Sequence, residues 1–296
     1  LIGTHALLYR QLDLSNLGLV VIDEQHRFGV EQRAGLIGKA KTPHTLFMTA
    51  TPIPRTVALT LYGDLDISVI REMPAGRQEV KTWVVPPEKR QAAYGWIKKQ
   101  IKLKHCQAFI VCPLIEPSAV ESMKDIKAAK AEFQKLAKEI FPDLRLGLLH
   151  GRLRPKENEA VIADFRLKKL DMLVATPVVE VGIDIPNAAI MLIEGADRFG
   201  LATLHQLRGR VGRSEKQSYC LLFASQKNKA YRRLKLMESS HNGLQLAEMD
   251  LKWRGPGELY GTAQHGFARL KLASFSDFAL IEKTRTAAAN LLTKYA

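Results

Sequence analysis

Cysteine is scarce in this sequence, and long hydrophobic runs are missing from it. The 296 residues contain three cysteines, Cys106, Cys112 and Cys220, and no two of them form a C-x-x-C pair. This scarcity argues against a disulfide framework or a zinc site and fits a reducing, cytoplasmic location. No run of about 18 apolar residues occurs, which excludes a membrane-spanning helix. The first five residues, LIGTH, carry neither an initiator methionine nor a signal-peptide pattern.

Positive charge is abundant but unevenly distributed. The formal net charge is +14. Lys and Arg number 7 against 7 Asp and Glu in residues 1–74, 25 against 17 in 75–225, and 12 against 6 in 226–296. A basic surplus confined to the later segments suits a nucleic-acid backbone as partner, with a merely soluble basic protein as the alternative. The 46% of hydrophobic residues is enough for one large or two modest domains.

One short apolar run ends in two adjacent carboxylates. Leu19 to Ile22 are apolar, and Asp23 and Glu24 follow at once. The run predicts a strand of a parallel sheet, buried on both faces, with the acids emerging at its carboxyl end. Ligands of open α/β sheets bind at that edge, where one acid can hold Mg²⁺ and another can position a water. The pattern predicts a Walker B element; a solvated acidic turn is the alternative.

Strands and helices alternate along most of the chain. Apolar runs predict the strands 19–22, 45–48, 81–85, 107–112, 145–149, 172–175, 188–193 and 218–223. Helical patterns fall near 88–103, 121–140, 155–169 and 203–209. Such alternation indicates parallel sheets with right-handed crossovers. The Pro- and Gly-containing stretch 73–77 predicts a linker, which divides the chain into a first segment, 1–74, and a second, 75–225.

The pattern changes in the third segment, 226–296. Residues 226–240 predict a basic amphipathic helix and 244–251 a second one, separated by His241-Asn242-Gly243. A Gly-rich stretch, Arg254–Gly261, follows, and the remainder looks helical. We therefore expect a helical hairpin and a loop after the second α/β segment.

Two further stretches carry chemistry. The second strand runs into Met48-Thr49-Ala50-Thr51-Pro52, whose hydroxyls can link a ligand site to a neighbouring domain, although a Thr-Pro turn alone is common. The stretch Gln206–Arg213, QLRGRVGR, places three arginines two or three residues apart. Forked guanidinium groups suit phosphate oxygens, and an arginine finger stabilises charge on a transferred phosphoryl group. A DNA-backbone patch and a solvated charged turn are the alternatives.

Together these residues resemble the superfamily-two helicases. DEQH stands where that class has motif II, TAT motif III, ATPVVEVGIDIPN (175–187) motif V, and QLRGRVGR motif VI. Longer stretches, among them VIDEQHRFGVEQR, MTATPIPRTVALTLYGDLDISVI, LLHGRL and WRGPGELYGTAQHG, are similar to the RecG family of ATP-dependent DNA translocases. The transcription-repair coupling factor Mfd shares TATPIPRT and the C-terminal motif, but DLDISVI and RGPGE favour RecG.

The resemblance assigns roles residue by residue. It implies that Asp23 binds Mg²⁺ and that Glu24 activates the attacking water. The γ-phosphate would face three residues of motif VI, with Arg213 as the finger: Gln206, Arg210 and Arg213. The nucleotide or its coupling to the second lobe would involve Gln25, His26, Gly182 and Asp184. Coupling of hydrolysis to movement would involve Thr49, Thr51, Arg254 and Gln264. The DNA backbone would contact Thr4, His5, Arg55, His150, Gly151 and Thr176, although a buried His or a capping Thr is common at any one of these positions.

Two departures from the family pattern stand out. No Gly-Lys-Ser/Thr occurs, so the phosphate-cradling loop is absent from this sequence, and with it the nest of backbone N–H groups that holds the β- and γ-phosphates. Ala263 stands where the family usually has Arg, which removes a positive side chain from the C-terminal loop. We expect a fragment that begins inside the first motor lobe and lacks the wedge domain.

The resemblance implies a fold and a function. The fold is α/β: two RecA-like P-loop NTPase lobes with parallel sheets, the first truncated at its N-terminus, followed by a helical hairpin and loop. The intact parent is expected to be an ATP- and Mg²⁺-dependent double-stranded DNA translocase that remodels stalled forks in recombination and repair. Expected partners are forks, Holliday junctions, duplex arms and a single-strand-binding protein, with no membrane and a monomeric state. A non-catalytic DNA-binding module is the alternative for the truncated form.

Overall fold

The computed structural model describes most of the chain in two compact units, Leu1–Pro52 and Ile53–Ala296. The described residues are 1–4, 7, 17–24, 43–50, 68–70, 72, 76, 78–113, 123–177, 185–213, 215–225, 229–254 and 278–295. Within these residues no helix is long and apolar enough to cross a membrane. The three predicted segments, 1–74, 75–225 and 226–296, stay predictions.

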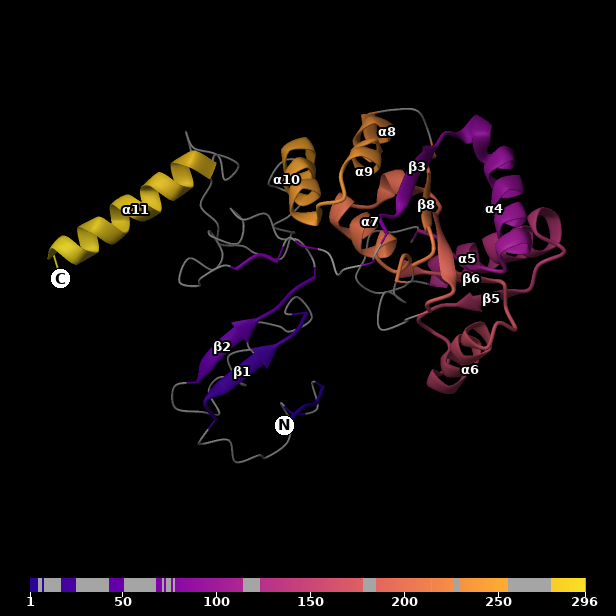
Figure 1. Cartoon of the computed structure of the whole chain (residues 1–296), viewed down its shortest axis with the longest axis horizontal. Coiled ribbons are helices and arrows are strands. Elements are labelled where there is room, and N and C mark those ends of the chain that lie inside the picture. Colours follow the sequence, from indigo (N-terminus) through magenta and orange to yellow (C-terminus); the bar gives the residue numbers. More distant parts are fainter. Residues whose placement is uncertain are drawn as a thin grey trace. The chain divides into compact units, whose positions relative to one another are not determined.

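The first unit contains two parallel strands, β1 (Leu19–Ile22) and β2 (His44–Phe47), which pair residue for residue from Leu19 with His44 to Ile22 with Phe47 (Figure 1). β1 has the predicted bounds, and β2 begins and ends one residue earlier than expected. The expectation that β1 is buried on both faces is wrong. Val20 and Ile22 are buried, whereas Leu19 and Val21 are 56% and 49% exposed, because no described element of this unit covers their face.

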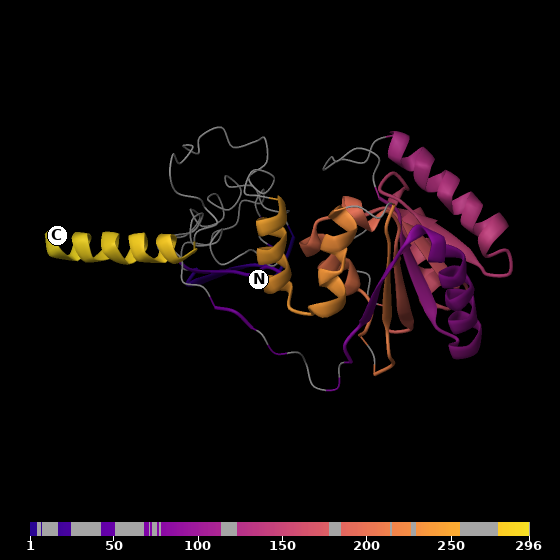
Figure 2. The same ribbon diagram turned by 90° about the horizontal axis from the view of Figure 1, so that it is seen from above.

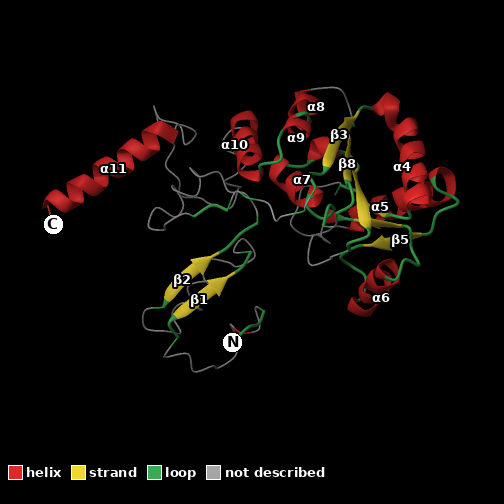
Figure 3. Ribbon diagram, viewed as in Figure 1, coloured by secondary structure: helices red, strands yellow, loops and turns green. Residues whose placement is uncertain are grey.

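The second unit is built around a six-stranded, all-parallel sheet in the order β3-β8-β7-β4-β6-β5. Figure 3 shows strands of this sheet in yellow, with β3, β8 and β5 labelled. The strands are β3 (Lys81–Val85), β4 (Gln107–Val111), β5 (Leu146–Leu149), β6 (Met172–Ala175), β7 (Ala188–Ile193) and β8 (Tyr219–Phe223). β4, β6 and β7 are buried at every residue, as continuous apolar runs in the middle of a parallel sheet require. The predicted strands are confirmed to within one residue.

Helices cover both faces of this sheet (Figure 2). α4 (Arg90–Lys104) and α5 (Met123–Lys135), which continues as a π-helical turn over Leu136–Ile140, pack on one face with Tyr94, Ile97 and Leu136. α6 (Pro155–Arg166) and α7 (Leu201–Arg208) pack on the other face. The sheet and its two helical layers confirm the predicted α/β lobe.

The helices that follow β8 share the core of the second unit. They are α8 (Lys229–Leu234), α9 (Leu236–Ser239) and α10 (Gly243–Arg254). Leu234, Met237 and Leu246, one from each helix, are buried in the cluster that also contains α7. The single helix predicted over 226–240 is therefore two short helices, whereas the second helix of the hairpin is confirmed. A last helix, α11, spans Phe278–Tyr295.

Candidate functional site

The two acidic residues after β1 lie beside the end of β2. The N–H of Glu24 donates to Oδ1 of Asp23 (2.8 Å), and Glu24 adopts a left-handed backbone conformation with φ of 49°. This turn directs the Glu24 carboxylate toward β2, where its Oε2 accepts a hydrogen bond of 3.5 Å from the N–H of Ala50. The carboxyl ends of β1 and β2 therefore meet at one edge, and the DE and TAT stretches are in contact, as the parallel arrangement predicts.

The donor set at this edge fits a magnesium ion shared with a nucleotide. Asp23 is exposed and Glu24 half-buried, so both carboxylates remain accessible. Among the described residues no group of three or more His, Cys, Asp or Glu side chains could hold a metal ion by itself. Mg²⁺ is commonly held by one or two carboxylates together with water and substrate phosphates, so Asp23 suits such an ion without a protein cage.

Several other predicted residues, from both units, are placed only in part. Thr49 and Thr4 are exposed, and the N–H of Leu7 donates to the Thr4 carbonyl (3.0 Å). The following predicted residues lie outside the described residues: His5, Gln25, His26, Thr51, Arg55, Gly182, Asp184 and Gln264. Arg254 is the last residue of α10, and only its backbone is described.

The predicted finger residues lie around the end of α7. Gln206 is in the last turn of the helix, and the N–H of Arg210 donates to the Leu207 carbonyl (3.0 Å) in the turn that follows. Val211, the next residue in the sequence, is fully buried, whereas Arg213 is exposed. Gly212 has φ of +76°, and a Cβ built there would lie 2.7 Å from Cγ2 of Val80. This close approach needs glycine and fixes Arg213 beside the entry to β3.

Arg208, the first arginine of the same stretch, has a different environment. Its side chain is 3% exposed, and Nη1 donates to the carbonyls of Met237 (2.8 Å) and Ser240 (3.1 Å), while Nη2 donates to Nδ1 of His205 (2.9 Å). Burial lowers the pKa of this guanidinium. Arg208, to which the resemblance assigns no phosphate contact, thus holds the end of α9 against α7.

A second buried arginine ties the other end of α7 to the same helices. Nη1 of Arg233, in α8, forms an ion pair of 2.8 Å with Oδ1 of Asp250, in α10, and both side chains are buried or nearly so. Oδ2 of Asp250 accepts the N–H of Leu201, the first residue of α7 (2.9 Å), and Nη2 of Arg233 donates to the carbonyl of Phe199 (2.8 Å). The helix that carries motif VI is thus fixed to the hairpin at both of its ends.

The predicted DNA contacts of the second unit gather at the carboxyl ends of β5 and β6. His150 and Gly151 directly follow β5, and Thr176 directly follows β6. Gly151 is exposed, whereas His150 and Thr176 are 5% and 2% exposed. Nδ1 of His150 and Oγ1 of Thr176 are buried and make no hydrogen bond. The N–H of Thr176 donates to the carbonyl of Leu149 (3.3 Å), so the two residues follow neighbouring strands at this edge. Their contact with the DNA backbone stays a prediction.

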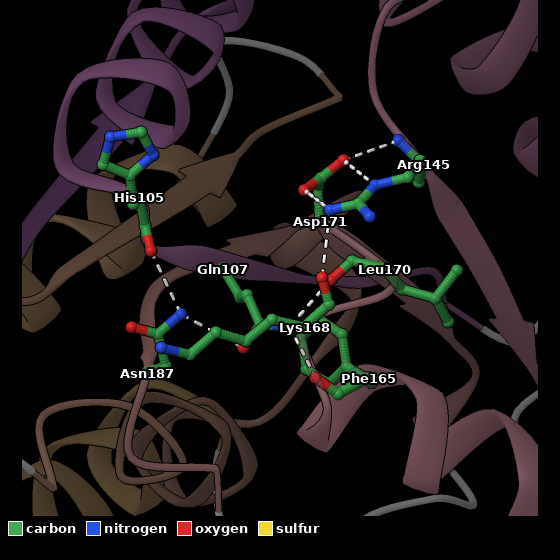
Figure 4. Close-up of polar contacts among 8 residues, drawn as sticks. All are labelled: His105, Gln107, Arg145, Phe165, Lys168, Leu170, Asp171 and Asn187. Carbon is green, nitrogen blue, oxygen red and sulfur yellow. Dashed lines mark hydrogen bonds and ion pairs between the residues drawn. The ribbon is translucent and has the colours of Figure 1, made fainter.

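A polar network that the sequence does not predict lies at the amino ends of the strands (Figure 4). The buried amide of Gln107 donates from Nε2 to the carbonyls of Phe165 (2.6 Å) and Leu170 (2.7 Å) and accepts at Oε1 from Nδ2 of Asn187 (3.2 Å). Asn187 is the last residue of the motif V stretch. The network therefore anchors the end of motif V to the start of β4 and the end of α6, and a lone glutamine gave no sequence signal for it.

Comparisons with known proteins agree with this architecture. The family model of the helicase conserved C-terminal domain matches residues 94–215, and that of ATP-dependent DNA helicase RecG, domain 3, C-terminal, matches residues 240–295. Yeast Dbp5 bound to RNA and ADP BeF3 shares the fold, with a TM-score of 0.55 at 16% identity over 96% of this chain and 66% of that one. The six-stranded sheet and its helices therefore have the fold of a helicase C-terminal domain.

Closer relatives define the family. "ATP-dependent DNA helicase RecG" of Synechocystis sp. is 53% identical over 275 residues, 93% of this chain and 33% of the relative. Its namesake in Thermotoga maritima is 48% identical over 96% of this chain and 36% of the relative. A structure of RecG bound to a three-way DNA junction has a TM-score of 0.71 and 46% identity over 95% of this chain and 36% of that one. The chain belongs to the RecG family, and it spans about a third of the length of these relatives.

Proposed function

We propose that this chain is the motor portion of an ATP-dependent DNA helicase that translocates on duplex DNA and remodels branched DNA, such as stalled forks and Holliday junctions. The contact between Glu24 and the N–H of Ala50 carries the proposal, because it joins the acidic motif to the coupling motif at the edge where α/β sheets bind nucleotides. The family name and the junction-bound relative support DNA as the substrate.

The residues have separate tasks in this proposal. Asp23 would hold Mg²⁺, and the ion would neutralise charge on the phosphates of ATP. Glu24 takes a proton from the attacking water, and Arg213 stabilises the charge that develops on the transferred phosphoryl group. Thr49 and the buried contacts of α7 with α8–α10 transmit lobe movement to the DNA. The DNA backbone is positioned by His150, Gly151 and Thr176. The active form is a monomer in the cytoplasm.

The test compares this 296-residue chain with an upstream-extended parent that contains a Gly-Lys-Ser/Thr loop. We expect DNA-stimulated ATP hydrolysis only from the parent, because phosphoryl transfer depends on positioning the phosphates. In the parent, Glu24→Gln should retain nucleotide binding and lose turnover, and Arg213→Ala should lose roughly 10³-fold or more in rate. Arg166→Ala, an exposed arginine at the end of α6, is the matched control and should leave the rate unchanged. Near-normal hydrolysis by Arg213→Ala would move the finger to Arg210.

The basic charge of the chain supports a second candidate for this chain by itself, a DNA-binding module without turnover. Such a module should bind duplex DNA with an affinity whose logarithm falls linearly with the logarithm of the salt concentration. Robust ATP turnover by the isolated chain would refute this candidate, and a salt-independent affinity would refute DNA binding through phosphates.

A further inference from the structure

Three aromatic side chains form a cluster at the edge of the second sheet, on the face covered by α4. Trp83, in the edge strand β3, stacks on Tyr219 of β8 with ring centroids 5.4 Å apart and an interplanar angle of 20°. Trp96 of α4 meets both rings edge-on, at 5.3 Å from Trp83 and 4.9 Å from Tyr219. Trp83 nevertheless remains 40% exposed. A large, flat ring fixed by two aromatic neighbours thus faces solvent.

Lysines border this aromatic cluster. Lys81 is the register partner of Tyr219 and lies two residues before Trp83, so it emerges on the same face of the strand. Nζ of Lys104 lies 5.3 Å from the centre of the Tyr219 ring and 3.4 Å from its hydroxyl oxygen. Burial raises the pKa of Cys106, and the nearby charges of Lys104 and Lys216 act against that rise. All three lysines are exposed.

The residue before Trp96 in α4 is an exposed glycine. A Cβ built on Gly95, next to Trp96, would meet no atom within 4 Å. Glu79 and Glu215 are the acidic residues nearest in sequence to Lys81 and Lys216, and Glu79 faces Nε2 of His241 at 3.6 Å. The cluster therefore combines an accessible aromatic ring with a surplus of positive charge.

We propose that Trp83, Trp96 and Tyr219, with Lys81, Lys104 and Lys216, bind single-stranded nucleic acid. Unpaired bases present flat faces that stack on an exposed aromatic ring, and the phosphates between them meet the lysines. Bases of a duplex are stacked on one another and cannot do so. The cluster is a site separate from His150 and Thr176, because β3 and β5 are the opposite edges of the sheet, about 24 Å apart at the usual strand spacing of about 4.8 Å. It also lies on the face opposite α7.

The test measures binding of labelled oligothymidylate and oligouridylate of about ten nucleotides by fluorescence anisotropy, with a DNA duplex as the parallel ligand. We expect W83A to weaken single-strand binding about 5- to 150-fold, since stacking of one base contributes about 1–3 kcal/mol. W83F should recover most of the affinity, because phenylalanine also stacks. W253A removes a tryptophan of α10 that is 51% exposed and should change nothing. Duplex affinity should be the same in all four proteins.

Salt dependence separates stacking from charge. K104A should reduce the slope of log affinity against log salt for the single strand by about 0.7, whereas W83A should leave the slope unchanged. If one oligonucleotide binds more tightly than the other, and W83A weakens that binding, the site is supported. The tighter ligand then identifies DNA or RNA as the nucleic acid that the site prefers.

Several results would overturn the proposal. Equal single-strand affinity of W83A and W253A would do so, as would equal losses for single strand and duplex. Protection of Trp83 from acrylamide quenching in the DNA-free, full-length parent would show that another part of the polypeptide covers the cluster. A lowered melting temperature of W83A, without recovery of binding in W83F, would assign Trp83 a packing role.

Discussion

Asp250 connects the hairpin to the helix that carries motif VI, and its replacement should destabilise the second unit. The carboxylate pairs with Arg233 at 2.8 Å and accepts the N–H of Leu201 at 2.9 Å, and the side chains of Asp250 and Arg233 are 13% and 6% exposed. Removing one partner of a buried ion pair leaves an uncompensated charge and costs about 3–5 kcal/mol. Asp250→Asn keeps the shape but removes the negative charge, so we expect a loss of this size.

The assay is thermal and urea-induced unfolding of the 296-residue chain. For a unit of this size, 1 kcal/mol corresponds to about 2–4 °C, so Asp250→Asn should lower the melting temperature by about 6 to 20 °C. Asp164→Asn is the matched control, because Asp164 pairs with Lys169 at 2.9 Å while both side chains are substantially exposed. Exposed pairs contribute about 0–1 kcal/mol, so the control should lose little. Equally small decreases in melting temperature for the two variants would refute the stabilising role of the buried ion pair between Asp250 and Arg233.

Three further outcomes follow from an ion pair, two buried thiols and a buried amide. The hydrogen bond from Arg145 holds the pKa of Asp171 below its usual value, so this carboxylate stabilises the folded state above about pH 4 and its contribution is lost as the pH falls through the depressed pKa. Asp171→Asn should therefore lower the free energy of unfolding at pH 7 and flatten its decline in acid, and an unchanged acid profile in urea titrations would contradict this. Burial raises the pKa of Cys112 and Cys220 to about 12, so iodoacetamide at pH 8 should modify these thiols only after unfolding, as mass spectrometry can follow. Modification of the native protein at the rate of the unfolded chain would show that they are accessible. Gln107→Leu should orphan the carbonyls of Phe165 and Leu170 and cost about 1–3 kcal/mol for each buried group left unpaired, measured by urea unfolding, and a neutral effect would show that water replaces the amide.

The sequence was most informative where one physical requirement dominates. A central strand of a parallel sheet must be apolar on both faces, so Ala188–Ile193 could be delimited from its continuous apolar run and was found with the predicted bounds. The same rule failed for β1. An apolar run predicts a strand, but it does not predict whether another element packs on each face of that strand. Leu19 and Val21 remain exposed for this reason.

Tertiary contacts hold the end of the segment in which one helix was expected over residues 226–240. Arg208 binds the carbonyls of Met237 and Ser240, which ends α9, and the carboxylate of Glu238 accepts the N–H of Val84 in the edge strand β3 (2.6 Å). Both partners are distant in sequence, so periodicity within the segment carries no information about them. The end of α9 is thus held by residues more than 25 positions away in the sequence.

The arginines of motif VI show how the two kinds of information combine. Spacing alone makes Arg208, Arg210 and Arg213 equivalent. Helical periodicity distinguishes them. Arg208 lies four residues after Leu204 and therefore falls on the same, buried side of α7. Arg210 and Arg213 come after the helix has ended. A buried guanidinium must have acceptors, and the carbonyl groups at the end of α9 supply them. One arginine therefore fixes motif VI to the hairpin, whereas Arg213, beyond the end of the helix, is exposed and Arg210 is half-buried.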